Sequence, residues 1–238
     1  MQYLTIPGLV VAGGGGDGRA YTSVEVFIPP TEQSCSLPSL PNMRVDHTMN
    51  GLLICGGGDI VFNKDCMEFS SGNWTTRNTL RKERTRHASW ESGEGLVMIG
   101  GPYSPTTTEM VGGDMVFSLE YDTEYVCAIP DMVTDSVVLT GGYPLPIRQV
   151  VARYDMLGMV EELPHLIIGR HSHGCGGYTR EDGGQVLLVG GGFTGSTVLS
   201  STEVLDVGDP AWVYTTSLPR QLMGVKGVTL GNTIYFTG

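Results

Sequence analysis

The chain has 238 residues, of which 35 are glycine, about twice the average share, and only 16% are charged. Glycine is costly in helix interiors and the charged helix-forming residues are scarce, so a long helical bundle is excluded. The hydrophobic content of 40% is too high for a disordered chain. These figures predict a compact all-β fold with many turns.

The net charge is −11, from 14 Lys and Arg against 25 Asp and Glu. An acidic protein repels the phosphate backbone, whose binding depends on Lys and Arg, so we expect no nucleic-acid partner. The one basic run, residues 77–86, is interpreted as a solvated loop. No stretch has the roughly 20 mostly apolar residues of a membrane-spanning helix, and we expect no membrane span.

A short hydrophobic run that ends in two glycines recurs along the whole chain. Such a run, bounded by a turn signal, predicts a buried strand. The first glycines of the runs stand at positions 13, 56, 100, 141, 190 and 238, so the repeats are 41 to 49 residues long. The last run, 233–238, has only its first glycine. The predicted structural glycines are Gly13, Gly14, Gly56, Gly57, Gly100, Gly101, Gly141, Gly142, Gly190 and Gly191.

Further landmarks follow each glycine pair in the same order. A second strand with an exposed acidic residue is predicted at 24–27, 67–69, 151–155 and 203–206. A Leu or Leu-Pro step comes next, and then an Arg. In three repeats a His stands three residues after this Arg: Arg44 with His47, Arg84 with His87 and Arg170 with His173.

Three repeats depart from this order. After Gly100 and Gly101 the second strand is either 108–111 or 114–117. At the start of the fourth repeat we place Asp131 and Asp135 where an Arg and a His stand elsewhere. In the sixth repeat Met223 replaces the His after Arg220.

Together these landmarks resemble the kelch repeat over essentially the whole chain. The resemblance implies a kelch-type β-propeller of four-stranded antiparallel blades, in which neighbouring blades supply the core. We interpret 1–238 as a single domain with five repeats and a truncated sixth, that is, a six-bladed ring truncated at the C-terminus. A five-bladed ring closed by strand exchange is the alternative. Residues 121–130 are also similar to a poorly characterised animal subgroup of kelch proteins, several of which are extracellular.

The kelch resemblance also implies a binding face. In the family, the loops after the Gly-Gly strand and after the outermost strand share one face, which often binds peptides or partner proteins. Arg pairs with carboxylates, and Tyr and Arg are frequent in binding hot spots, so an acidic peptide fits such a face. The alternative is that the arginines brace neighbouring blades by binding backbone carbonyls. The candidate binding residues are Asp59, Tyr103, Tyr143, Phe193, Arg44, Arg84, Arg170 and Arg220.

The favoured function is therefore a non-enzymatic module that binds a protein or peptide, with no cofactor and no metal. His47, His87 and His173 begin strands of separate blades, so we expect structural histidines rather than a metal cluster. Some kelch propellers hold a copper oxidase site of Tyr, His and a Tyr–Cys crosslink. A galactose-oxidase-like enzyme is thus one alternative, although no such set is recognisable, and a structural spacer in a larger protein is another. The glycine-rich stretch 13–18 precedes a strand, whereas a dinucleotide site needs a helix N-terminus.

The five cysteines leave the cellular compartment open between cytoplasmic and extracellular. No Cys-x-x-Cys pair is present, so a zinc or redox motif has no support. The cysteines are either buried small hydrophobic residues or disulfide partners. Their odd number leaves at least one free thiol, or a partner outside this sequence. The five are Cys35, Cys55, Cys66, Cys127 and Cys175.

Overall fold

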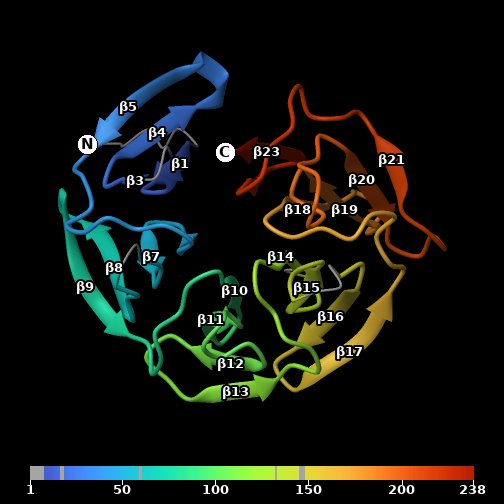
Figure 1. Ribbon diagram of the computed structural model, residues 1–238, viewed down its shortest axis with the longest axis horizontal. Coiled ribbons are helices and arrows are strands. Elements are labelled where there is room, and N and C mark those ends of the chain that lie inside the picture. The colour runs from blue at the N-terminus through green and yellow to red at the C-terminus, as the bar shows by residue number, and fades with distance from the viewer. Residues whose placement is uncertain (1–7, 17–18, 59–60, 132, 145–147) are drawn as a thin grey trace. The chain divides into compact units, whose positions relative to one another are not determined.

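The computed structural model describes residues 8–16, 19–58, 61–131, 133–144 and 148–238. Contacts divide the chain into two compact units, 1–85 and 86–238. Across the described residues the regular elements are strands, apart from one short 3-10 turn, Pro29–Thr31 (Figure 1). The all-β prediction is confirmed. No helix in this part of the chain is long and apolar enough to cross a membrane.

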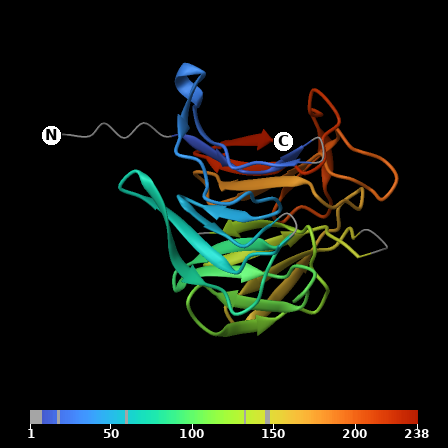
Figure 2. The same ribbon diagram turned by 60° about the vertical axis from the view of Figure 1, so that its left-hand side comes forward.

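The first unit contains two antiparallel sheets, which we call blades 1 and 2. Blade 1 has three strands in the order β1-β4-β5, and a short pair, β2 and β3, lies in the loop after β1. Blade 2 has four strands in chain order, and its outer hairpin of β8 and β9 is drawn in teal in Figure 2. The strands are β1 (Leu9–Ala12), β2 (Gly15–Gly16), β3 (Arg19–Ala20), β4 (Val24–Ile28), β5 (Gln33–Leu37), β6 (Thr48–Asn50), β7 (Leu53–Cys55), β8 (Asp65–Ser70) and β9 (Asn73–Thr79).

The second unit contains blades 3, 4 and 5, each with four antiparallel strands in chain order, and a final pair of strands. The first strands of successive sheets, β10, β14, β18 and β22, are neighbours. The strands are β10 (Ala88–Ser92), β11 (Gly95–Ile99), β12 (Thr107–Met110), β13 (Met115–Ser118), β14 (Cys127–Asp131), β15 (Ser136–Thr140), β16 (Val151–Asp155), β17 (Gly158–Leu163), β18 (Gly174–Thr179), β19 (Gln185–Gly190), β20 (Thr202–Asp206), β21 (Val213–Thr215), β22 (Lys226–Leu230) and β23 (Thr233–Thr237).

The structure has five blades, so the prediction of a six-bladed ring is wrong. The sixth hydrophobic run does form a strand, β23, but this strand pairs only with β22 among the described strands. A repeat signal marks one strand, whereas a blade requires three or four strands that pair with one another. The hydrophobic run 233–238 therefore predicted strand β23 correctly, but it did not indicate a complete sixth blade.

The hydrophobic cores lie between successive blades rather than inside one. One core joins Val138 and Val151 of blade 4 to Leu187 and Leu205 of blade 5. Another joins blade 3 to blade 4 around Trp90. Strand β15 is buried along its whole length because both of its faces are covered. A single repeat therefore cannot bury its own apolar faces, as is typical of repeat folds.

The fifth glycine pair is Gly191–Gly192, and the predicted pair Gly190–Gly191 is wrong by one residue. Gly190 ends strand β19, whereas Gly191 and Gly192 have φ values of +66° and +96°. The four earlier pairs likewise have positive φ at both glycines. Because residues 190–192 are all glycine, the sequence alone does not show which two of them form the pair.

Four of the five cysteines form disulfides, which decides between the alternatives that the sequence left open. Cys55–Cys66 joins the neighbouring strands β7 and β8. Cys127–Cys175 joins the first strands of blades 4 and 5, with Cα atoms 5.9 Å apart. Cys35, on β5, is exposed and free. Disulfides of this kind persist in oxidising compartments.

We expect one titratable thiol per chain in denaturant without reductant, because disulfide-bonded sulfur does not react with a thiol reagent. Reduction should raise the count to five. The Cys35→Ser variant should show no thiol before reduction. A count of five thiols in protein purified and denatured without reductant would contradict both disulfides.

Candidate functional site on the loop face

A linker precedes the first strand of each new sheet, and its backbone meets the glycine pair of the preceding blade. The amide of the second glycine donates a hydrogen bond to a linker carbonyl, over 2.7–2.9 Å, in all five described cases. We call the end of the blades where glycine pairs and linkers meet the loop face. The pairs are Gly14 to Arg44, Gly57 to Arg84, Gly101 to Thr123, Gly142 to Arg170 and Gly192 to Leu222.

These hydrogen bonds correct two sequence assignments. The linker residue equivalent to the arginines is Thr123 in front of blade 4, not Asp131, which ends strand β14. In front of β22 it is Leu222, so the exposed Arg220 is not an equivalent residue. The loops of the third and fifth repeats differ in length from the others, so counting residues along the sequence placed Asp131 and Arg220 at the wrong equivalent positions.

Arg44, Arg84 and Arg170 are buried, with at most 1% of each residue exposed. The Arg44 guanidinium donates to the carbonyl oxygen of Gly56 over 2.7 Å and to Oδ2 of Asp65 over 2.6 Å. The guanidinium therefore holds the glycine pair of blade 2, while the Arg44 carbonyl holds the glycine pair of blade 1. Burial leaves the three side chains little surface for a partner, and the contacts of Arg44 match the bracing alternative.

Arg170 forms a fully buried ion pair. Its guanidinium donates to the carbonyl oxygens of Gly191 and Ser201, over 2.7 and 3.0 Å, and to Oε1 of Glu203 over 2.5 Å. Both side chains of the ion pair are fully buried. The Glu203 carboxylate also accepts hydrogen bonds from the amides of Ile167 and Ile168. The sequence predicted an exposed acidic residue within 203–206. Asp206, with 41% of its side chain exposed, fits this prediction, whereas Glu203 is buried and neutralises Arg170.

We expect Arg170→Met to lower the free energy of unfolding by about 3–5 kcal/mol, because it leaves the buried Glu203 carboxylate without its cation. Urea unfolding at neutral pH measures this loss. The double variant Arg170→Met, Glu203→Leu should recover most of the stability, since removing both charges avoids an unpaired one. Wild-type stability in the single variant would contradict the bracing role.

The histidines that follow the arginines also belong to the fold. His173 is buried, and its Nε2 lies 2.8 Å from Oγ1 of Thr140. Burial, with the nearby Arg170 charge, holds the pKa of His173 well below its ordinary value of 6.5. His87 is buried and His47 is half-buried. Across the described residues no three His, Cys, Asp or Glu side chains converge as a metal-ligand set.

We expect the free energy of unfolding to decrease as the pH falls below about 6.5, because the unfolded chain then protonates His173 and the folded chain does not. The slope for one such group is at most about 1.4 kcal/mol per pH unit. Denaturant titrations from pH 8 to pH 5 measure it. His173→Gln should reduce the slope, and His165→Gln, at an exposed position, should keep it. Equal slopes in wild type and His173→Gln would contradict this account.

The loop face of the second unit carries a half-buried cluster of aromatic residues around His171. The imidazole of His171 lies 5.4 Å from the Tyr125 ring, 5.9 Å from the Tyr143 ring and 5.6 Å from the Phe193 ring, between centroids. Arg86 stacks over Tyr125, 4.9 Å from its centroid. We call Arg86, Glu124, Tyr125, Tyr143, His171 and Phe193 the loop-face cluster.

The backbone fixes these side chains in place. In blades 4 and 5, the residue after the glycine pair forms a two-way hydrogen-bonded bridge with a linker: Tyr143 with Glu124, and Phe193 with His171. The linkers are also joined to one another, because the Tyr125 amide donates to the Arg86 carbonyl and the Ser172 amide to the Tyr125 carbonyl. The cluster therefore stands on a rigid frame rather than on independent loops, which suits a binding site.

Charge at the cluster is balanced and partly buried. The Arg86 guanidinium lies 3.9 Å from the Glu124 carboxylate, with 42% of the Arg86 side chain and 18% of the Glu124 side chain exposed. Burial raises the pKa of Glu124, and the Arg86 charge opposes this shift. Burial also lowers the pKa of His171. The cluster thus offers aromatic faces, one imidazole and one accessible guanidinium.

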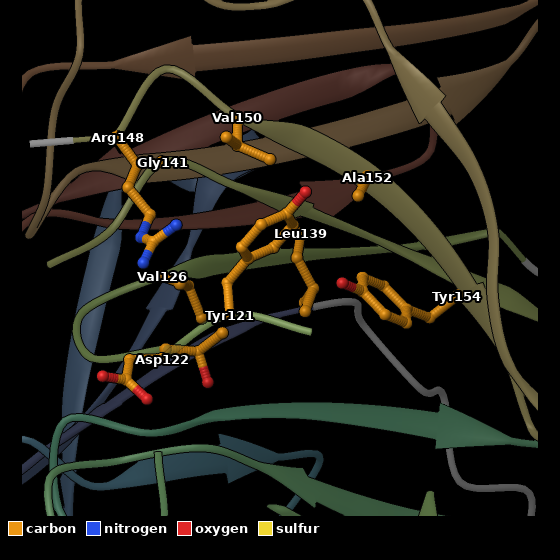
Figure 3. Close-up of a pocket in the computed structure, with 10 residues that line it drawn as sticks. Tyr121, Asp122, Val126, Leu139, Gly141, Arg148, Val150, Ala152 and Tyr154 are labelled. Carbon is orange, nitrogen blue, oxygen red and sulfur yellow. The ribbon is translucent and has the colours of Figure 1, made fainter. Parts of the chain in front are cut away.

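The linker in front of blade 4 has Thr123 in place of the buried arginine, and a small pocket lies at this position (Figure 3). The amide of the first glycine, Gly141, binds the Val150 carbonyl, as Gly191 binds the Ser201 carbonyl in blade 5. If these two hydrogen bonds are aligned, Thr123 of blade 4 is equivalent to Arg170 of blade 5, and Ala152 is equivalent to Glu203. Two small side chains therefore occupy the positions of the large charged pair. Thr123, Gly141, Val150 and Ala152 all line the pocket.

Both polar and apolar side chains line the pocket. Arg148 stacks on the Tyr121 ring, 5.0 Å from its centroid, and both residues line the pocket with Asp122 (Figure 3). Burial is the main reason that the pKa of Tyr154 is raised to about 12, so its phenol is protonated at neutral pH. The cavity volume that the centre of a water molecule can occupy is about 20 Å³. This volume holds a water molecule but not an organic ligand.

The predicted binding residues therefore fall into separate groups. Tyr143 and Phe193 belong to the loop-face cluster, and Tyr103 is exposed on the loop after Gly101. Asp59 lies outside the described residues. The sequence analysis missed four members of the cluster. A spacing signal exists for them, since they stand one or two residues after a linker acceptor: Arg86, Glu124, Tyr125 and His171.

Comparison with known proteins supports the fold but not a family. No protein-family model matches the chain, and no curated protein sequence gives a significant match. Among solved structures, that of YjhT is similar, with a TM-score of 0.67 at 14% sequence identity. The similarity covers 88% of this chain and 81% of that chain. At this identity it shows the fold alone: an all-β propeller with four-stranded antiparallel blades.

Proposed function

We propose that the chain is a kelch-type propeller that acts as a non-enzymatic binding module for a protein or peptide, through the loop face of residues 86–238. The kelch assignment rests on the phased glycine pairs and on the buried Arg170, whose backbone and side chain bind two successive blades. The binding assignment rests on the loop-face cluster. It is the one observation that carries the proposal, because it gathers the aromatic and guanidinium groups that dominate binding hot spots.

The chemistry of the cluster indicates what it binds. The rings of Tyr143 and Phe193 each meet the His171 imidazole edge to face, and all three residues are half-buried. An apolar or aromatic side chain that packs against them therefore needs little further desolvation of the cluster. Arg86 is the accessible cation at the edge of the cluster. A carboxylate of the partner would compete with Glu124 for this guanidinium. The partner segment should thus combine an aromatic or apolar anchor with an acidic residue.

We favour a binding module over a galactose-oxidase-like enzyme because of the cysteine positions. A Tyr–Cys crosslink requires a reduced cysteine beside a tyrosine. Cys55, Cys66, Cys127 and Cys175 are engaged in disulfides. The remaining cysteine, Cys35, is free but exposed at the surface on β5. A spacer role remains compatible with the fold, but it does not require an aromatic cluster at the surface.

Selection of peptides from a random displayed 12-residue library on the immobilised protein tests this function. We expect selected peptides to share an aromatic or apolar residue near an acidic one. Their affinity should fall at least tenfold for Tyr143→Ala and for Phe193→Ala. Tyr103→Ala, at an exposed tyrosine outside the cluster, is the matched control and should bind as wild type does. Failure to select any peptide class, or unchanged affinity in both cluster variants, would overturn the proposal.

A further inference from the structure

The opposite end of blades 3 and 4 carries an open groove lined by methionines. Linkers and glycine pairs mark the loop face, so the turns between first and second strands and between third and fourth strands lie at the other end of each antiparallel blade. The groove is formed there by the turns β10–β11, β12–β13 and β16–β17. Its apolar lining is Met110, Met115, Val116, Met156 and Leu157.

The turn β16–β17 holds Leu157 outward. Oδ1 of Asp155 accepts hydrogen bonds from the amides of Leu157 and Gly158, over 2.7 and 3.1 Å. Leu157 is 93% exposed and Met115 is 41% exposed, and both line the groove beside Met110, Val116 and Met156. Exposed contiguous apolar groups mark interaction surfaces, and flexible thioether side chains adapt to the shape of a partner. A folded turn that presents a leucine to solvent is therefore suited to docking.

Charge selects the kind of partner. Two carboxylates, Glu94 and Asp114, line the groove together with the apolar residues. The described residues of the turns β14–β15, β18–β19 and β20–β21, at the same end of the second unit, also include acidic residues. Arg180 is their one basic residue among those described, and it is paired with Asp206. The further acidic residues of these turns are Asp135, Glu181, Asp182 and Asp209.

We propose that this groove binds a cationic amphipathic segment of a partner protein. Large apolar side chains of the segment would pack on Met115 and Leu157, and its Lys or Arg residues would face Glu94 and Asp114. An anionic membrane surface is disfavoured because the acidic turns repel it. A second copy of this chain is disfavoured because both copies would carry the same negative charge, −11 in total for each chain. The site is at the other end of the blades from the loop-face cluster and is independent of it.

A synthetic 18-residue peptide of Leu and Lys in helical amphipathic order is the probe, labelled for fluorescence anisotropy. We expect saturable binding that weakens at least tenfold when the same residues are scrambled out of amphipathic order. A Leu and Glu version should not bind. Binding should also weaken as salt rises from 50 to 500 mM, because exposed charges are screened.

Variants locate the site. Leu157→Ser and Met115→Ser should each weaken binding by about tenfold, and Glu94→Gln with Asp114→Asn should flatten the salt dependence. Val213→Ser is the matched control, since Val213 is an exposed apolar residue of blade 5 outside the groove. Tyr143→Ala should bind the probe as wild type does, which separates this result from the fate of the loop-face function. Thermal unfolding of each variant checks the fold.

Several outcomes would overturn the proposal. Equal binding of the scrambled peptide would show general attraction between opposite charges rather than a groove. Equal weakening by Val213→Ser, or none by Leu157→Ser, would place the contact elsewhere. Binding of the wild-type protein to phosphatidylserine vesicles in place of the peptide would assign the groove to a membrane. Dimerisation in sedimentation that Leu157→Ser abolishes would assign it to a second copy.

Discussion

The hydrogen bond from the second glycine of each pair to the following linker is the contact on which the stacking of the blades depends. It recurs five times among the described residues with nearly constant length. This close backbone approach leaves no space for a side chain at one or both glycines of each pair, although a Cβ at Gly14 itself would meet nothing. A Cβ at Gly141 would overlap the carbonyl oxygen of Arg170, and one at Gly142 would lie 2.5 Å from Cγ1 of Val126. The glycine pairs therefore repeat because blade contact requires them.

The buried arginines extend this contact from the backbone to the side chains. Arg44 and Arg170 each use a main-chain carbonyl for one blade and a guanidinium for the next. Where a blade lacks the arginine, as blade 4 does, the space becomes a water-sized pocket. The linker in front of blade 4 keeps the backbone contact between Thr123 and Gly101 but lacks the arginine side chain. The same linker supplies Glu124 and Tyr125 to the loop-face cluster.

Much of the fold could be predicted from the sequence because glycine spacing reports directly on backbone contacts. The strand that ends at each glycine pair was placed correctly, except that the run 190–192 concealed the true fifth pair. Blade number could not be predicted, because it depends on how many strands pair and not on how often one strand recurs. The run 233–238 had the right signal, yet its strand, β23, pairs only with β22 among the described strands.

The candidate site was less accessible to sequence reasoning. An arginine on a loop is normally exposed, and its burial depends on a carboxylate far away in the sequence, such as Glu203 for Arg170. Both residues were noticed, but their contact was not. Tyr143 and Phe193 were predicted because they directly follow glycine pairs. His171, at the centre of the cluster, was not predicted, because only the backbone bridge to Phe193 brings it there.

Native-state hydrogen exchange of the glycine amides tests the central claim most directly. If the linker contacts hold the blades together, the amides of Gly14, Gly57, Gly101, Gly142 and Gly192 should exchange only through global unfolding. The amides of Gly72 and Gly183, in exposed hairpin turns, should exchange far faster. Equally fast exchange at both kinds of glycine would show that the blades do not depend on these contacts.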